Sequence, residues 1–385
     1  MMLLVIVHFL IQVTEATKVK LDPDVGKSTV ELIEARGYVA ETHNVTTVDG
    51  YILTLHRLPI SYKECRAGKK PVQDKPVVLI QHGILDTSFS WVCNFRNQSL
   101  AFVLADAGYD VWLGNNRGNT YSSNHVNYTT DDDAFWDFTW EDMGKFDLPA
   151  MIKYVRKTSG RKTISYVGFS EGAIQAFVTF SEDQSLAKLV SYFAAMGPVA
   201  WLGHTSGTAF KFLSKAYADT LLQVTHQAKF FPHNEMLQEV IGATVCTKKP
   251  WLCEKAVALF VGDSENWNAS RRIATAADCL RALGISMCPT RFCENKAKYG
   301  SFDPPAFPVS KMKYPRTGFF RGEMDILSTP ADMDHLRLAL PPATVIHDEN
   351  ISSFSHLDFI WATNANEKVY QSVLEQLNRY NGHGY

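Results

Sequence analysis

A serine between two glycines has the residue types and the spacing of a nucleophile. Ser170 is the central residue of Gly168-Phe169-Ser170-Glu171-Gly172, which fits the pattern G-x-S-x-G. In this pattern a strand turns into a helix so sharply that a Cβ at either glycine would collide with its surroundings. The serine at the turn is strained, and its Oγ projects. We therefore expect Ser170 to be the nucleophile.

The acid that supports such a serine is expected after a late strand. A serine hydroxyl needs a histidine base, and the histidine needs an acid that fixes its tautomer. At a strand–turn–helix nucleophile the order along the chain is serine, acid, histidine. Asp325 fits because it follows the predicted strand at 317–320. Asp332 and Asp334 fall within the next predicted helix, and Glu323 faces the opposite way if the strand continues.

The histidine is expected in the loop after the last strand. His356 lies in the polar loop 351–356, which follows the predicted strand at 344–347. His347 lies inside that strand, and His335 lies on a predicted helix. Position, loop setting and chain order therefore favour His356 as the general base.

Two backbone N–H groups are expected to bind the oxyanion that forms when the serine attacks an ester. One belongs to the residue after the nucleophile, Glu171. The other should come from the loop His82-Gly83-Ile84-Leu85 at the end of an earlier strand, where glycine permits a tight turn. We assign it to Leu85, with Ile84 as its neighbour. An ordinary turn at the strand end is the alternative interpretation.

The elements that must position these residues alternate between strand and helix. Such alternation predicts a mainly parallel sheet with helices on both faces. An initial hairpin with a two-residue turn is predicted around Asp49-Gly50, and a loop is predicted at 61–75. The predicted strands are 76–80, 110–113, 163–167, 189–196, 317–320 and 344–347, and the predicted helices are 99–107, 142–158, 171–180, 330–340 and 367–380.

The domain division follows from a change in composition in the second half of the chain. From 201 to about 307 helical patterns predominate and buried-strand patterns are scarce, which indicates a helical cap inserted into the core. The predicted parts are a signal peptide at 1–16, a core at 17–200 and 311–385, and a cap at 201–310.

The N-terminus has features of a secretory signal. Leu3 to Ile11 is apolar except for His8, and small residues follow at Thr14-Glu15-Ala16, although no Lys or Arg precedes the apolar run. A buried helix of the mature protein is the alternative. Five Asn-x-Ser/Thr triplets also suggest secretion and N-glycosylation, at Asn44, Asn97, Asn127, Asn268 and Asn350.

Composition and cysteine spacing argue against two other classes of protein. With 385 residues, 46% of them apolar, the chain can bury a sizeable core. Its net charge of −2 and the lack of a basic stripe argue against nucleic-acid binding. The seven cysteines do not alternate with histidines at metal spacing, so no metal and no cofactor is expected. Cys246 and Cys253 are close enough in sequence to close a small disulfide loop.

Several stretches of the sequence resemble the acid lipase family of animals, which includes gastric lipase and lysosomal acid lipase. They are DGYILTLHRLP, QHGILDTS, SLAFVLADAGYDVWLGNNRGNTYS, FWDFTWEDMGKFDLPAMIKYV, FFPHN and SHLDFIW. The resemblance implies an α/β-hydrolase fold with a helical cap and a secreted or lysosomal setting. It also implies hydrolysis of triacylglycerols or cholesteryl esters at an oil–water or membrane interface, with no obligate protein partner.

The resemblance also implies residue roles. By position, Ser170, Asp325 and His356 match the family's triad, and Leu85 and Glu171 match its oxyanion donors. Cys246 and Cys253 fall where the family has a disulfide in the cap, with a slightly tighter spacing.

The chain departs from the family pattern at both neighbours of the nucleophile. The family usually has His before the serine and Gln after it, where this chain has Phe169 and Glu171. Because the oxyanion donor is a backbone N–H, we expect Glu171→Gln to leave activity the same or higher. The segment 278–303 also matches the family poorly and is shortened.

Two other functions remain as alternatives. One is a lipid-binding or carrier protein that kept the fold but lost turnover, which the changes at Phe169 and Glu171 favour and a complete triad opposes. The other is a carboxylesterase that acts on small dispersed esters.

Overall fold

The computed structural model describes residues 23–24, 26–207, 250–267, 300 and 306–385. Their centre is a nine-stranded sheet with the order β1-β2-β4-β3-β6-β7-β8-β9, in which β5 pairs with β2. Pairing is antiparallel up to β2–β4 and parallel from β4 to β9, so the predicted mostly parallel sheet is confirmed. The strands are β1 Glu41–Thr46, β2 Tyr51–Leu58, β3 Val77–Gln81, β4 Asp110–Leu113, β5 Asn124–His125, β6 Ile164–Phe169, β7 Val190–Met196, β8 Thr317–Gly322 and β9 Val345–Ile351.

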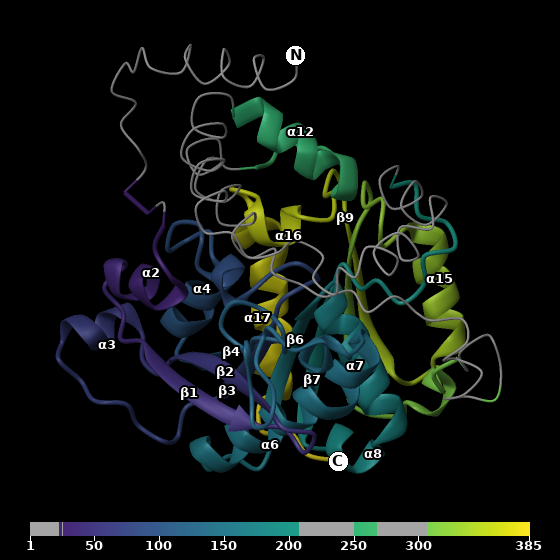
Figure 1. The fold of residues 1–385 in the computed structure, drawn as a ribbon. Helices are drawn as coiled ribbons and strands as arrows, with labels where there is room; N and C mark the ends of the chain where they lie inside the picture. The colour runs from purple at the N-terminus through teal and green to yellow at the C-terminus, as the bar shows by residue number, and fades with distance from the viewer. Residues whose placement is uncertain (1–22, 25, 208–249, 268–299, 301–305) are drawn as a thin grey trace, which may run out of the picture.

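Helices cover both faces of the sheet (Figure 1). Successive side chains of β3 enter two different cores: Val78 and Ile80 face one, and Val77 and Leu79 face the other. A strand that is apolar at every position suits this place, because neither of its faces meets water. The first core is closed by α4 Leu100–Asp106 and α17 Gln371–Tyr380, and the second by α6 Leu148–Ser159, α7 Glu171–Glu182 and α15 Pro330–Ala339.

The remaining helices complete the described chain. The α-helices among them are α2 Thr29–Ala35, α3 Tyr62–Arg66, α5 Trp140–Asp142, α8 Gln184–Ala187, α12 Pro250–Val261 and α16 Asp358–Trp361. Single 3₁₀ turns occur at η1 Ser88–Trp91, η2 Asp133–Trp136 and η5 Val309–Lys311, and π turns at η3 Met143–Asp147 and η6 Asn366–Tyr370.

Three local predictions differ from the structure. The first hairpin has a three-residue loop, because Thr47 N–H bonds to the Tyr51 carbonyl and only Gly50 has positive φ. The predicted loop 61–75 contains α3, which begins with a capping box formed by Ser61 and Glu64. The predicted helix 142–158 is interrupted by η3, where a Cβ on Gly144 would lie 2.8 Å from the Val178 Cβ.

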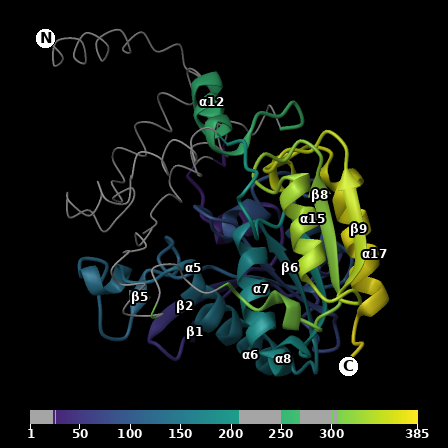
Figure 2. The same cartoon turned by 90° about the vertical axis from the view of Figure 1, so that its right-hand side faces the viewer.

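A long insertion, residues 197–316, separates β7 from β8. In Figures 1 and 2 its helix α12 lies beyond the carboxyl ends of the parallel strands, where a cap was expected. Much of 201–310 lies outside the described residues, so the division into core and cap stays a prediction. Residues 1–16, the predicted signal peptide, also lie outside the described residues.

Candidate active site

Ser170 occupies the sharp turn between β6 and α7. Its backbone angles, φ 52° and ψ −113°, lie where a residue with a side chain is strained. The two flanking glycines are required by close backbone contacts. A Cβ on Gly168 would lie 2.7 Å from the Gly172 carbonyl oxygen, and one on Gly172 would lie 2.6 Å from the Gln81 carbonyl oxygen. The sequence pattern and the geometry therefore agree on a nucleophile turn.

The structure brings Ser170, His356 and Asp325 together. His356 Nε2 lies 2.8 Å from Ser170 Oγ, and His356 Nδ1 lies 2.8 Å from Asp325 Oδ2. All three residues are buried. With the carboxylate accepting from Nδ1–H, Nε2 is left as the acceptor for the serine proton, which is the arrangement of a Ser-His-Asp triad.

Backbone groups fix the acid and join its loop to the loop of the base. Asp325 Oδ1 accepts hydrogen bonds from the N–H groups of Leu327 at 2.9 Å and Ser328 at 2.8 Å, which hold the carboxylate in place. Met324 N–H donates to the Phe354 carbonyl, 2.9 Å away, so the loops after β8 and β9 are bonded to each other.

The other acidic and histidine residues considered for the triad lie elsewhere. Asp332 accepts from the Thr329 hydroxyl at the start of α15 and from His204. Glu323, Asp334 and His335 are exposed, and the His335 ring lies beside Trp201. His347 lies within β9 and faces Glu349. None of these groups approaches Ser170 in the way that Asp325 and His356 do.

The two predicted oxyanion donors lie on either side of Ser170. Glu171 is the first residue of α7, and N–H groups in the first turn of a helix have no acceptor within the helix. Leu85 has φ 56°, which turns the loop after β3 back on itself. In this loop a Cβ on Gly83 would lie 3.1 Å from the Ser170 Cβ, so the loop passes directly beside the nucleophile. Their role as oxyanion donors stays a prediction.

His82 holds this loop in place through both of its ring nitrogens. Nδ1–H donates to the Gly83 carbonyl at 2.8 Å. Nε2 accepts from the Asn116 backbone N–H and from Asn119 Nδ2, both at 3.2 Å. Burial lowers the pKa of His82 to about 4, so the ring is neutral with its proton on Nδ1. From the sequence, His82 was predicted only as part of a turn, because the groups that donate to its Nε2 are more than 30 residues away.

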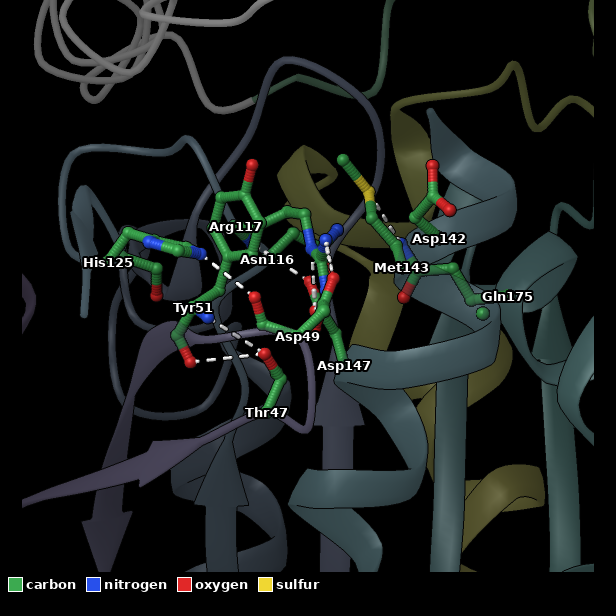
Figure 3. Close-up of polar contacts among 12 residues, drawn as sticks. Thr47, Asp49, Tyr51, Asn116, Arg117, His125, Asp142, Met143, Asp147 and Gln175 are labelled. Atoms are coloured by element: carbon green, nitrogen blue, oxygen red, sulfur yellow. Dashed lines mark hydrogen bonds and ion pairs between the residues drawn. The ribbon is translucent and has the colours of Figure 1, made fainter. Parts of the chain in front are cut away.

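A buried ion pair anchors the loop that supports His82. Figure 3 shows Arg117 held between Asp49 and Asp147. Its Nε–H donates to Asp147 Oδ1 at 2.8 Å, and its backbone N–H donates to Asp147 Oδ2 at 3.0 Å. Its NH1 group donates to Asp49 at 2.6 Å, and its guanidinium lies 3.9 Å from the Tyr51 ring centroid. Arg117 follows Asn116 directly, so this ion pair fixes the loop on which His82 depends.

The two unusual neighbours of the nucleophile have different environments. The Phe169 ring packs on the His356 ring, with 5.0 Å between centroids. The Glu171 carboxyl is buried, and burial, with a smaller contribution from the Asp147 charge, raises its pKa to about 7.

A second carboxyl with a raised pKa, that of Asp86, directly follows Leu85 in the sequence. Burial raises its pKa to about 7 as well, against hydrogen bonds from Ser90 and Thr87. Asp86 lies within QHGILDTS but was not among the predicted site residues.

The remaining predicted sites are placed as follows. Cys246 lies outside the described residues, so the pairing with Cys253 stays a prediction. Four predicted glycosylation sites, Asn44, Asn97, Asn127 and Asn350, are exposed, and Asn268 lies outside the described residues.

Within the described ranges no cluster of three or more His, Cys, Asp or Glu side chains could hold a metal ion. Over the same ranges no helix has the length and apolarity needed to cross a membrane.

Two protein-family descriptions match the chain. "Partial alpha/beta-hydrolase lipase region" matches residues 29–95, and "alpha/beta hydrolase fold" matches residues 76–231. Among solved structures, a bacterial membrane phospholipase A has a TM-score of 0.55 at 13% identity, covering 98% of this chain and 96% of its own. A Pyrococcus furiosus esterase has a TM-score of 0.51 at 16% identity, covering 93% and 98%. These likenesses confirm the α/β-hydrolase fold.

Similarity to characterised sequences is closer and spans nearly the whole chain. Gastric triacylglycerol lipase of Mus musculus is 34% identical over 375 residues, which are 92% of this chain and 93% of that protein. The Homo sapiens enzyme is also 34% identical, over 92% of both chains. Lipase lipl-1 of Caenorhabditis elegans is 33% identical over 378 residues, again 92% of both. The chain therefore belongs to the acid lipase family that includes gastric triacylglycerol lipase.

Proposed function

We propose that this protein is a lipase that hydrolyses the carboxylic esters of neutral lipids, triacylglycerol above all, through Ser170, His356 and Asp325. The observation that carries the proposal is the continuous pair of 2.8 Å contacts from Asp325 through His356 to Ser170. Its substrate class is supported by relatives named triacylglycerol lipase. Cholesteryl ester is a second substrate of the same chemistry.

The reaction has two halves. Ser170 Oγ attacks the acyl carbonyl while His356 Nε2 takes its proton, and the Leu85 and Glu171 N–H groups receive the oxyanion. Collapse of this intermediate breaks the ester C–O bond, and the imidazolium protonates the departing alcohol. Water activated by His356 then hydrolyses the acyl-enzyme, while the Asp325 carboxylate stabilises the imidazolium in both halves.

The cellular setting is part of the proposal. A secreted or lysosomal location is supported by the relatives named gastric lipase and by the exposure of four Asn-x-Ser/Thr sites. A lipid ester presented at an oil–water or membrane interface is the substrate partner that the proposal requires.

Turnover of emulsified triolein tests this function most directly. We expect the protein to release oleate from emulsified triolein faster than it releases acid from dispersed short-chain esters. A serine-directed phosphonate should form one covalent adduct per chain at Ser170, located by peptide mass spectrometry, and Ser170→Ala should form none. Adduct formation with turnover of short-chain esters only would point to a carboxylesterase. No adduct and no turnover, with lipid binding retained, would point to a carrier.

Glu171 should make the enzyme less active at alkaline pH. Because its pKa is raised to about 7, the carboxyl is neutral in acid and becomes negative as the pH rises through 7, beside the forming oxyanion. We expect Glu171→Gln to match the wild type at pH 5 and to exceed it about tenfold in kcat at pH 8. Tenfold corresponds to about 1.4 kcal/mol of charge repulsion in the transition state.

The stability of the same variant should follow the same titration. A carboxyl whose folded pKa lies above its unfolded value stabilises the fold fully below the unfolded pKa and loses this contribution as pH rises through the folded pKa. Glu171→Gln should therefore raise Tm relative to the wild type at pH 8 and leave it similar at pH 4. Glu182→Gln, at the exposed end of the same helix, is the matched control. An equal activity ratio at pH 5 and pH 8 would show that Glu171 does not titrate at the site.

A further inference from the structure

A segment in the middle of the insertion is bonded to the loop that carries the catalytic base. After α12, residues 262–267, which we call the exit segment, return toward the core. The partner of the exit segment is the chain from Ser353 to Asn364, which contains His356. The contact therefore links the insertion to the loop that holds the His356 imidazole between Ser170 and Asp325.

Asp358 is the centre of this contact. Its side chain is fully buried, and one oxygen, Oδ1, accepts from the Ser264 hydroxyl at 2.6 Å. The other oxygen accepts from the Ser355 backbone N–H at 2.7 Å and from Asn266 Nδ2 at 3.2 Å. Ser355 and Asp358 bracket His356 in the chain. One carboxylate therefore bonds the exit segment on one side and the His356 turn on the other.

Further contacts hold the exit segment against the chain around His356. Asn266 Nδ2 also donates to the Ser353 carbonyl at 3.1 Å, and the Asn266 carbonyl accepts from Thr363 N–H at 2.9 Å. Trp267 forms an antiparallel bridge with Ala362, and its ring meets the Trp361 ring edge-on at 5.5 Å. The exit segment therefore contacts residues on both sides of His356 in the sequence.

The beginning of the insertion makes a similar contact with the loop of the acid. The Thr205 hydroxyl and the Ser206 N–H both donate to the Ile326 carbonyl, at 2.7 and 3.1 Å. The Ser328 hydroxyl donates to the Pro198 carbonyl at 2.7 Å. Two segments of the insertion, one at its start and one in its middle, are therefore bonded to loops that carry members of the triad.

We propose that the exit segment, through Ser264 and Asp358, positions His356 for proton transfer, so that the insertion contributes to turnover. Asp358 is a positioning residue in this role, because it acts on His356 through the Ser355–Asp358 turn and touches no reacting atom. The inference rests on the proposed function, since it assigns a support to the base of that reaction.

Ser264→Ala tests the proposal with a small change at the edge of the contact. It removes the donor to Asp358 Oδ1 and leaves the His356 turn itself intact. Displacement of a catalytic group by about 1 Å can cost about 100-fold in rate, so we expect kcat on a dispersed ester to fall about 10- to 100-fold. KM should stay within about twofold of the wild type, and Ser264→Thr, which keeps the hydroxyl, should restore most of kcat.

Rates are expressed per active site titrated with the phosphonate, so unfolded protein does not contribute. Ser185→Ala is the matched control, because Ser185 likewise donates its hydroxyl to a carboxylate, Asp183, at 2.5 Å, at the exposed start of α8. The proposal is overturned if Ser264→Ala leaves kcat unchanged, if only KM rises, or if threonine does not restore the rate. In each of these outcomes wild-type turnover and labelling would leave the proposed function intact, whereas an inactive and unlabelled wild type would refute that function instead.

Discussion

Ser170→Ala is expected to lower kcat for ester hydrolysis by about 10⁶-fold, and His356→Ala by a similar factor. Each change removes one member of the Ser170–His356 pair. The remaining member cannot act alone, because the serine needs a base to become a nucleophile and the histidine needs the hydroxyl that it deprotonates. The double variant should therefore be no slower than either single variant. Initial rates on a soluble ester, measured with each variant at equal folded concentration, test this non-additivity.

Asp325→Asn should have a smaller but still large effect, a fall in kcat of about 10⁴-fold. The amide can donate to His356 Nδ1, which would favour the tautomer with its proton on Nε2, facing Ser170. Asp334→Asn, on the exposed side of the next helix, is the control and should retain full activity. If Asp325→Asn retained more than a tenth of wild-type kcat, the assignment of the acid would be wrong.

Arg117→Ala is expected to reduce the free energy of unfolding by about 3–5 kcal/mol. The side chains of Arg117 and Asp147 are only 1% and 0% exposed, so the truncation would leave a carboxylate without its cation in a site that water does not reach. Urea denaturation followed by tryptophan fluorescence measures this loss. The variant that remains folded should also hydrolyse esters more slowly, because the same ion pair anchors the loop that holds His82.

Arg379→Ala is the matched control for this change. Arg379 pairs with Glu375 at 2.9 Å, at a distance typical of a good ion pair, yet both side chains are more than half exposed. Exposed pairs contribute about 0–1 kcal/mol. Equal destabilisation by the two substitutions would show that burial does not determine the contribution of the Arg117 pair.

The sequence was sufficient to predict the parts of the site that depend on local chain geometry. G-x-S-x-G predicts the nucleophile turn because both glycines are forced by backbone contacts within a few residues or with the adjacent strand. Asp325 and His356 were found from the rule that loops at the carboxyl ends of parallel strands converge. These predictions needed the order of elements and no detail of packing.

The parts that sequence reasoning missed depend on contacts between distant segments. His82 is fixed by Asn116, Arg117 by Asp49, and Asp358 by Ser264, and each pair is separated by more than 30 residues. No periodicity relates such positions, so a single sequence carries no signal for them. The three-residue hairpin loop was missed for another reason, since Asp-Gly is compatible with more than one turn length.

The order of the triad along the polypeptide has a consequence for biosynthesis. Ser170 follows β6, whereas Asp325 and His356 follow β8 and β9, the last two strands to leave the ribosome. A nascent chain that has emerged only as far as the insertion possesses the hydroxyl but neither group that activates it. Hydrolysis by this triad therefore cannot begin until β8, β9 and the loops after them have been synthesised.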